Sequence, residues 1–293
     1  MIEPALNPES GFRRIRIDLT YDGTNFAGWA KQPDQRTIQG SLEDALWKIT
    51  RSEVQTVVAG RTDAGVHATG QVVHVDIPDD LQNSRYRPSE DIWDFEHFKF
   101  RLNQILDEDV RILGVEFAPT NFDARFSATA RHYRYKLLDG NRNLMPLQRI
   151  DAATWFRDLD IDLMNEAAAP LLGRHDFFTF CRYREGATSL RTLLKFDWSR
   201  DGDDFVICQI AADGFGWNMV RNLVGAAVCV GEGRFQPSWM AEILESKARV
   251  SDSYVFPARG LTLVQVDYPS AAELLAEPHL PADLEGALSD DEE

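Results

Sequence analysis

The sequence alternates twice between segments with the two-residue hydrophobic period of a strand and segments with the spacing of an amphipathic helix. In the first half, residues 14–21 alternate polar and apolar side chains and end at the turn dipeptide Asp22-Gly23. Apolar side chains then recur at helical spacing after Thr37, a residue type that favours the position just before a helix. The remaining elements predicted in this half are strands at 56–59, 71–77 and 110–117, a helix at 96–106 and a glycine-rich loop at 60–70.

The second half of the chain repeats this alternation. Helices are predicted to open at Asp160 and at about Asn218, with strands at 131–138, 193–198, 205–211 and 261–266. Two similar halves of mixed strands and helices predict an α+β fold in which helices cover one face of a sheet. We therefore expect an N-terminal extension at 1–11, an N-terminal half at 12–126 that carries the glycine-rich loop, a C-terminal half at 127–269 and an acidic, disordered tail at 270–293.

The distribution of charge limits how such a protein can meet nucleic acid. Its net charge is −16 and its pI is near 4.8, the wrong sign for a surface that approaches phosphate groups. Ten of the 47 acidic residues lie in 1–10 and 271–293, which contain no Lys or Arg, so that 37 acidic and 31 basic residues remain between them, a net charge of −6. Binding of nucleic acid would therefore depend on local clusters of Arg and Lys.

Other classes of protein are disfavoured by what the sequence lacks. Residues 1–10 have neither a basic flank nor an apolar run, and no apolar stretch approaches the roughly 20 residues that span a bilayer. The three cysteines, Cys181, Cys208 and Cys229, are far apart and form no CxxC pair, which argues against a zinc knuckle and a disulfide framework. We expect a cytoplasmic protein without a membrane anchor.

The densest group of chemically informative residues is the loop segment 59–68, Ala-Gly-Arg-Thr-Asp-Ala-Gly-Val-His-Ala. Its glycines allow sharp turns and the close approach of a ligand, and its one carboxylate, Asp63, stands next to Arg61 and Thr62. A neighbouring cation favours the ionised carboxylate that a nucleophile or base requires. On spacing alone, an aspartate that caps a turn is the commoner explanation. The loop is not a phosphate-binding Walker motif, because Val66 stands where that motif has lysine.

No metal site is expected near this loop. Six residues separate His67 from His74, and no second cluster of His or Cys accompanies them. His74 and Asp76 are instead assigned to the polar face of a strand.

Segment 128–136 interleaves basic and aromatic residues. On a strand, Arg131, Tyr133, Tyr135 and Leu137 would point to one side, and His132, Arg134 and Lys136 to the other. Rings that stack on an unpaired base and cations that meet phosphates are what recognition of single-stranded RNA uses. A strand with its tyrosines in the core and its cations in solvent explains the pattern equally well.

A third informative segment, 213–225, is a glycine-rich loop that runs into a helix. Arg221 lies about 100° around that helix from Val220, at the edge of the apolar stripe. A cation at such a position can be half-buried and then needs a carboxylate partner. Asp63 is a candidate for that partner, although spacing cannot pair residues so far apart.

Together and in this order, these segments resemble the tRNA pseudouridine synthase A family. The resemblance covers residues 12–269 in five ordered blocks, which are 21–23 with 28–29, 60–67, 121–128 with 133–135, 219–225 and 260–261. Three positions depart from the family's pattern: Ala30 follows Gly-Trp where glutamine is usual, Trp217-Asn218 replaces Tyr-His, and 106–109 replaces a Leu-Pro-x-Asp turn. These departures bear on RNA affinity and site preference more than on the reaction.

The resemblance implies a fold, a partner and roles for particular residues. The fold would be two ferredoxin-like (RRM-like) halves that share a central mixed, mainly antiparallel sheet with a cleft between them, in a homodimer whose clefts are completed by the partner. Asp63 would be the catalytic carboxylate, Tyr133 the ring that packs on the target base and helps to deprotonate C5, and Arg221 the cation that pairs with Asp63. Arg61 would help to flip out the target, and Thr62 and His67 would contact the substrate.

The implied reaction converts uridine to pseudouridine at positions 38, 39 and 40 in the anticodon stem-loop of tRNA. It has no redox step and so needs no cofactor, but the base must leave its stack. Asp63 could attack C1′ of the ribose, attack C6 of the base or remove the C2′ proton, and the sequence does not choose among these routes. The alternatives from other classes are a non-catalytic RNA-binding protein and a carboxylate-dependent hydrolase.

Overall fold

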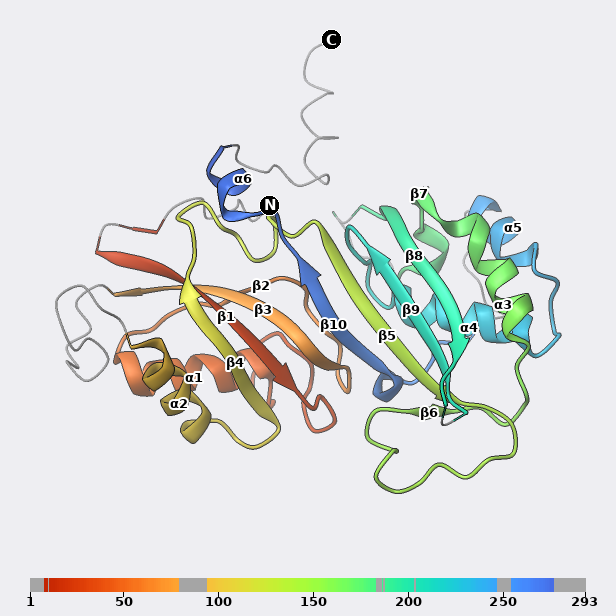
Figure 1. The fold of residues 1–293 in the computed structure, drawn as a ribbon, viewed down its shortest axis with the longest axis horizontal. Coiled ribbons are helices and arrows are strands. Elements are labelled where there is room, and N and C mark those ends of the chain that lie inside the picture. Colours follow the sequence, from red (N-terminus) through yellow and green to blue (C-terminus); the bar gives the residue numbers. More distant parts are fainter. Residues whose placement is uncertain are drawn as a thin grey trace, which may run out of the picture. The chain divides into compact units, whose positions relative to one another are not determined.

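The computed structural model describes residues 8–9, 11–78, 94–182, 186, 188–202, 204–246 and 254–276 (Figure 1). The chain forms two compact units. Unit 1 comprises the chain up to Ala64, Ala68–Thr129 and the chain from Val266 onward, and unit 2 comprises Gly65–His67 and Ala130–Gln265. The main division falls after Thr129, three residues beyond the boundary that the sequence predicts between 126 and 127.

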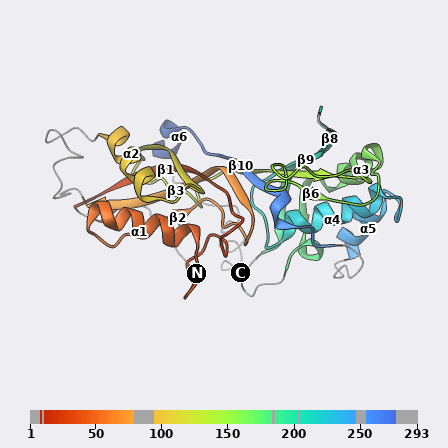
Figure 2. The ribbon, with the colours of Figure 1, turned by 90° about the horizontal axis from the view of Figure 1, so that it is seen from below.

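Unit 1 contains a four-stranded antiparallel sheet in the order β4-β1-β3-β2. Its elements follow one another as strand, helix, strand, strand, helix, strand. Their bounds are β1 Phe12–Tyr21, α1 Ile38–Thr50, β2 Val57–Val58, β3 His67–Pro78, α2 Phe95–Ile105 and β4 Val110–Phe117. Figure 2 shows α1 along one face of these strands.

Local chemistry explains why the predicted elements of unit 1 form. The Thr37 side chain accepts a hydrogen bond from the N–H of Gly40, which satisfies one of the free donors in the first turn of α1. The helix then buries Leu42, Leu46 and Ile49, which recur at helical spacing, against a sheet whose β1 side chains alternate between the core and the other face. The predicted strand at 14–21 and the helix after Thr37 are confirmed.

The second face of this sheet carries buried polar groups. The guanidinium of Arg14, 2 % exposed, donates to both carboxylate oxygens of Asp76 at 2.8 Å and to the carbonyl of Phe122 at 2.9 Å. His74, also 2 % exposed, accepts at Nδ1 from the N–H of Ala124 at 2.9 Å. Segment 119–127 therefore covers this face, so His74 lies on the polar face of its strand but is not solvated. Burial, with Arg14 nearby, lowers the pKa of His74 to about 4.

Unit 2 has the strand order β10-β5-β9-β8, extended by β7 at its edge. Its elements β5, α3, β8, β9, α4 and β10 follow the same order as those of unit 1, with β6, β7 and α5 inserted between them. The elements are β5 Ala130–Leu138, β6 Ala153–Thr154, α3 Ile161–Ala168, β7 Gly173–Asp176, β8 Leu190–Arg200, β9 Val206–Ala212, α4 Met219–Gly231, α5 Trp239–Ser246 and β10 Leu261–Asp267, the last two residues of β10 belonging to unit 1. Short 3-10 helices occupy Ala169–Leu171, Phe178–Phe180 and Ala258–Gly260. The mixed α+β class predicted from the sequence is confirmed.

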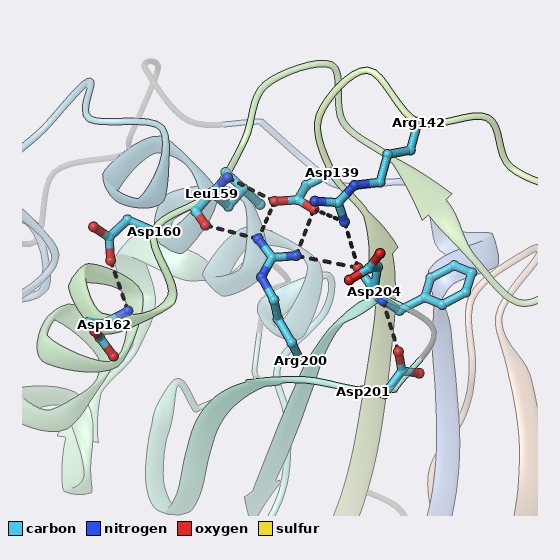
Figure 3. A network of polar contacts seen from close by, with 9 residues as sticks. Asp139, Arg142, Leu159, Asp160, Asp162, Arg200, Asp201 and Asp204 are labelled. Carbon is cyan, nitrogen blue, oxygen red and sulfur yellow. Dashed lines mark hydrogen bonds and ion pairs between the residues drawn. The ribbon is translucent and has the colours of Figure 1, made fainter.

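One buried ion pair ties the long connection after β5 to the end of β8 (Figure 3). The carboxylate of Asp139, which is fully buried, accepts from both terminal nitrogens of Arg200 at 2.6 and 2.9 Å and from the N–H of Leu159 at 2.8 Å. Burial alone would raise the pKa of Asp139, but these hydrogen bonds outweigh it and hold the pKa below its usual value. The start of α3 is thereby fixed beside the sheet of unit 2.

The C-terminal segment differs in part from the expectation of a structureless tail. Residues Ala271–Ala276 form the short helix α6, and residues 277–293 lie outside the described part of the chain. Among the described residues, no helix is long and apolar enough to cross a membrane.

Candidate active site

The residues predicted to form the site belong to both units. Arg61, Thr62 and Asp63 follow β2 in unit 1, whereas His67, Tyr133 and Arg221 belong to unit 2. The pairing of Asp63 with Arg221 stays a prediction.

In unit 1 the loop after β2 is held from the interior by side chains of two strands. The hydroxyl of Thr62, a residue only 6 % exposed, lies 2.7 Å from the hydroxyl of Tyr21, the last residue of β1. Gln71 of β3 donates from Nε2 to the Tyr21 hydroxyl at 3.1 Å and to the carbonyl of Gly60 at 2.8 Å. The side chain of Thr62 thus points into unit 1, while Asp63 beside it is partly exposed.

The protonation state of Tyr21 sets the direction of these bonds. Burial raises the pKa of Tyr21 to about 12, despite the hydrogen bonds to Thr62 and Gln71, so the phenol is neutral at physiological pH. The amide of Gln71 is oriented by the N–H of Val72, which donates to Oε1 at 3.2 Å. Tyr21 therefore accepts from Gln71, and its own hydrogen is available to Thr62.

The backbone of the same loop is held from another side by the turn at Gly28-Trp29. The N–H of Trp29 donates to the carbonyl of Thr62 at 2.9 Å. Gly28 has φ +99, and a Cβ placed on it would lie 2.9 Å from the Thr62 oxygen, 3.1 Å from the Ala64 nitrogen and 3.2 Å from the Asp63 carbonyl carbon. Only glycine fits here, because a side chain would collide with backbone that has no room to move.

The first turn of α1 supports that turn in its place. The N–H groups of Ile38 and Gln39 donate to the carbonyls of Gly28 and Trp29 at 3.2 and 3.0 Å. The helix predicted after Thr37 therefore contributes to the site through its free N-terminal donors.

In unit 2, the two tyrosines of β5 lie in different environments. Tyr135 is fully buried and donates its hydroxyl to the carbonyl of Pro257 at 2.7 Å, and burial raises its pKa. Tyr133, two residues earlier, is 9 % exposed, and its ring meets that of Phe215 edge-on at 5.3 Å. Of the two explanations open from the sequence, the core explanation holds for Tyr135.

Arg221 lies in the first turn of α4 and is half-buried, as its position at the edge of the apolar stripe predicts. Its Nε donates to the carbonyl of Phe256 at 2.5 Å, and Nη1 donates to Oδ1 of Asn218 at 3.4 Å. Both of these acceptors are neutral groups of unit 2. A Cβ on Gly225 would overlap the carbonyl oxygen of Tyr254, which is why this helix carries glycine where it crosses the 254–257 segment.

The last of the predicted site residues is His67, which the sequence does not assign to a metal site. His67, the first residue of β3, is 5 % exposed and therefore largely buried. Within the described residues, no group of three or more His, Cys, Asp or Glu side chains could hold a metal ion. The sequence did not identify Tyr21 or Gln71 as residues that hold this loop, although a tyrosine at the end of a strand face that is otherwise aliphatic indicates a buried polar partner.

Comparisons with known proteins bear on the whole chain. Residues 19–127 and 167–269 match a family model described as tRNA pseudouridine synthase. Curated relatives named tRNA pseudouridine synthase A are 50% identical in Frankia casuarinae, over 91% of this chain and 93% of the relative, and 48% identical in Streptomyces griseus, over 92% of each. The Mycobacterium leprae relative of the same name is 45% identical over 94% of this chain and 96% of its own length.

Proposed function

Because the chain belongs to the tRNA pseudouridine synthase family, we propose that it isomerises uridine to pseudouridine in tRNA, with Asp63 as the catalytic carboxylate. One observation supports Asp63 most directly. The backbone just before it is held by buried hydrogen bonds at Gly60 and Thr62, Gly28 lies against the backbone of residues 62–64, and Asp63 itself is partly exposed. A carboxylate on a loop held in this way is what positioned catalysis requires.

The reaction breaks the N1 glycosidic bond, turns the uracil and rejoins it to C1′ through C5; C5 loses its hydrogen as a proton and N1 takes up a proton. Product and substrate are isomers, so no electrons are gained or lost and the chemistry requires no cofactor. The ionised Asp63 would attack C1′, attack C6 or remove the C2′ proton, and all three routes place the carboxylate beside the sugar of a flipped nucleotide.

Residues of unit 2 are proposed to assist. Arg221 would pair with Asp63 and keep it ionised, in an orientation that its hydrogen bonds to Phe256 and Asn218 help to set. Tyr133 would pack on the flipped base and help to remove the C5 proton. Arg61, which is exposed, would take the place of the flipped nucleotide, and His67 would line the substrate site.

The finer expectations about assembly and specificity remain proposals as well. Each unit is proposed to be a ferredoxin-like half, which the strand orders β4-β1-β3-β2 and β10-β5-β9-β8 support. We propose that the enzyme is a cytoplasmic homodimer and that its substrates are uridines 38, 39 and 40 of the anticodon stem-loop. Mapping of pseudouridine by mass spectrometry, in tRNA from cells with and without the protein, tests the positions.

The test of the reaction is tritium release from tRNA that contains 5-tritiated uridine. Asp63→Asn should show no turnover while still binding tRNA, because it removes the charge and keeps the shape. Asp34→Asn, at an exposed turn of the same unit, is the matched control and should behave as wild type. An Asp63→Asn enzyme with wild-type turnover would remove Asp63 from the mechanism.

The same assay separates the alternatives. A non-catalytic RNA-binding protein releases no tritium, and a carboxylate-dependent hydrolase yields free uracil in place of pseudouridine. Arg221→Ala should lose most of its turnover. Arg221→Lys should recover part of it, because lysine restores the positive charge but not the planar set of donors of the guanidinium. Near-normal turnover of Arg221→Ala would make this residue a structural cation of α4.

A further inference from the structure

Three polar side chains from distant parts of the sequence form a hydrogen-bonded chain inside unit 1. Gln71 donates to Tyr21 at 3.1 Å, and the hydroxyl of Tyr21 lies 2.7 Å from that of Thr62. The second hydrogen of the Gln71 amide reaches the carbonyl of Gly60 at 2.8 Å. Tyr21, Gln71 and Thr62 are respectively 4 %, 0 % and 6 % exposed, so this chain of groups is shielded from water.

Packing alone would not require these polar groups. Phenylalanine and leucine fill similar volumes without hydroxyl or amide groups that must be satisfied, and unsatisfied buried polar groups cost free energy. What the polar side chains add is attachment to the loop, because one end of the chain binds the carbonyl of Gly60 and the other binds the side chain of Thr62. Both attachment points come just before Asp63.

A separate set of contacts, from the turn at Gly28-Trp29, holds the backbone of the loop that carries Asp63. The N–H of Trp29 donates to the carbonyl of Thr62, and Gly28 lies against the backbone of residues 62–64. Thr62 is therefore held at its carbonyl by the turn and at its hydroxyl by Tyr21. Two independent attachments at one residue restrict both its translation and its rotation, and they pass that restriction to Asp63.

We propose that Tyr21 and Gln71, acting through Thr62, are positioning residues that set the orientation of the Asp63 carboxylate. This inference rests on the proposed function, in which Asp63 reacts at the nucleoside. It also gives Thr62 a different role from the substrate contact expected from the sequence, because its hydroxyl is directed into unit 1. None of the three side chains is proposed to touch the RNA.

The decisive variant is Tyr21→Phe, which removes one oxygen and keeps the ring that packs at 6.1 Å from Trp29. It leaves the Thr62 hydroxyl without this donor and the Gln71 amide without this acceptor, so Thr62 loses one of its two attachments. Because a displacement of about 1 Å can cost about 100-fold in rate, we expect kcat to fall about 10- to 100-fold. KM for tRNA should change by less than about twofold, since uniform binding is not touched.

Tyr268→Phe is the matched control. It also deletes a phenol hydroxyl of unit 1 that donates to a backbone carbonyl, that of Ala124 at 2.6 Å, but away from the Asp63 loop. It should lose comparable stability and keep wild-type kcat. Thr62→Ser, which keeps a hydroxyl, should retain most of the activity, whereas Thr62→Val should match Tyr21→Phe.

A double variant distinguishes a shared attachment from two separate effects. Tyr21→Phe combined with Thr62→Val should be no slower than either single variant, because both remove the same bond. Additive losses, or a Tyr21→Phe enzyme with wild-type kcat, would overturn the positioning role. A wild-type protein that releases no tritium would refute the proposed function itself. If the wild type is active and Tyr21→Phe is equally fast, only the positioning role is refuted.

Discussion

Replacing Gly28 with alanine tests whether the turn at Gly28-Trp29 fixes the position of the loop that carries Asp63. The substitution adds one methyl group, which would lie 2.9 Å from the Thr62 oxygen and 3.2 Å from the Asp63 carbonyl carbon. Those neighbours are backbone atoms whose own hydrogen bonds hold them, so the turn and the loop must separate. Asp63 would move with the loop.

The expected loss of stability has three contributions. A non-glycine residue in a left-handed conformation costs about 1–2 kcal/mol, and the forced contact costs about 1–3 kcal/mol, as for other overpacked sites. Alanine recovers about 0.4–1 kcal/mol by restricting the unfolded chain. The net loss for Gly28→Ala is therefore roughly 3 kcal/mol, together with a fall in kcat of about 10-fold or more from the displaced carboxylate.

Gly11→Ala isolates the contribution of the contact. Gly11 has φ +88 in the same unit, and nothing lies within 4 Å of a Cβ built on it, so this variant bears the backbone strain alone. Guanidinium unfolding should place the midpoint of Gly28→Ala below that of Gly11→Ala, and tritium release should be slowed only in Gly28→Ala. Equal midpoints and equal rates in the two variants would refute the close approach as a constraint on the loop.

Two further predictions concern the polar face of the unit 1 sheet. His74 has a pKa of about 4 in the folded protein against an ordinary value of 6.5, so between these pH values the unfolded chain binds more protons than the folded one. The free energy of unfolding should therefore fall by roughly 2–3 kcal/mol as the pH is lowered from 7 to 4. His74→Asn, which keeps an acceptor for Ala124 but does not titrate, should lose less over that range in denaturant titrations, and an identical pH dependence would exclude His74 as the source. Asp76→Asn removes the charge that pairs with the buried Arg14 guanidinium and should lower the free energy of unfolding by about 2–4 kcal/mol. Asp18→Asn, in a more exposed pair with Arg16, should lower it by less than about 1 kcal/mol. Equal losses in the two variants would show that burial of Arg14 does not matter.

The sequence alone determined the features whose causes are local. The N-cap at Thr37, the N-cap at Asp160 and the alternation through β5 each depend on neighbours within a few residues, and all were predicted within about two residues of the observed elements. The same holds for the motif that contains Asp63, because its glycines and its carboxylate are adjacent in the chain. Elements that exist only through pairing, such as β6 and β7, were not predicted, since two to four residues have too little pattern of their own.

Only the tertiary structure decided how the loop that carries Asp63 is held. Tyr21 is 41 residues from Thr62 and 50 from Gln71, and no periodicity reports on contacts across such separations. The same is true of His74, which a strand pattern assigns to a polar face and which the 119–127 segment then covers and deprives of water. Periodicity reports which side of an element a residue occupies, whereas burial and hydrogen bonding depend on what the rest of the chain places against that side.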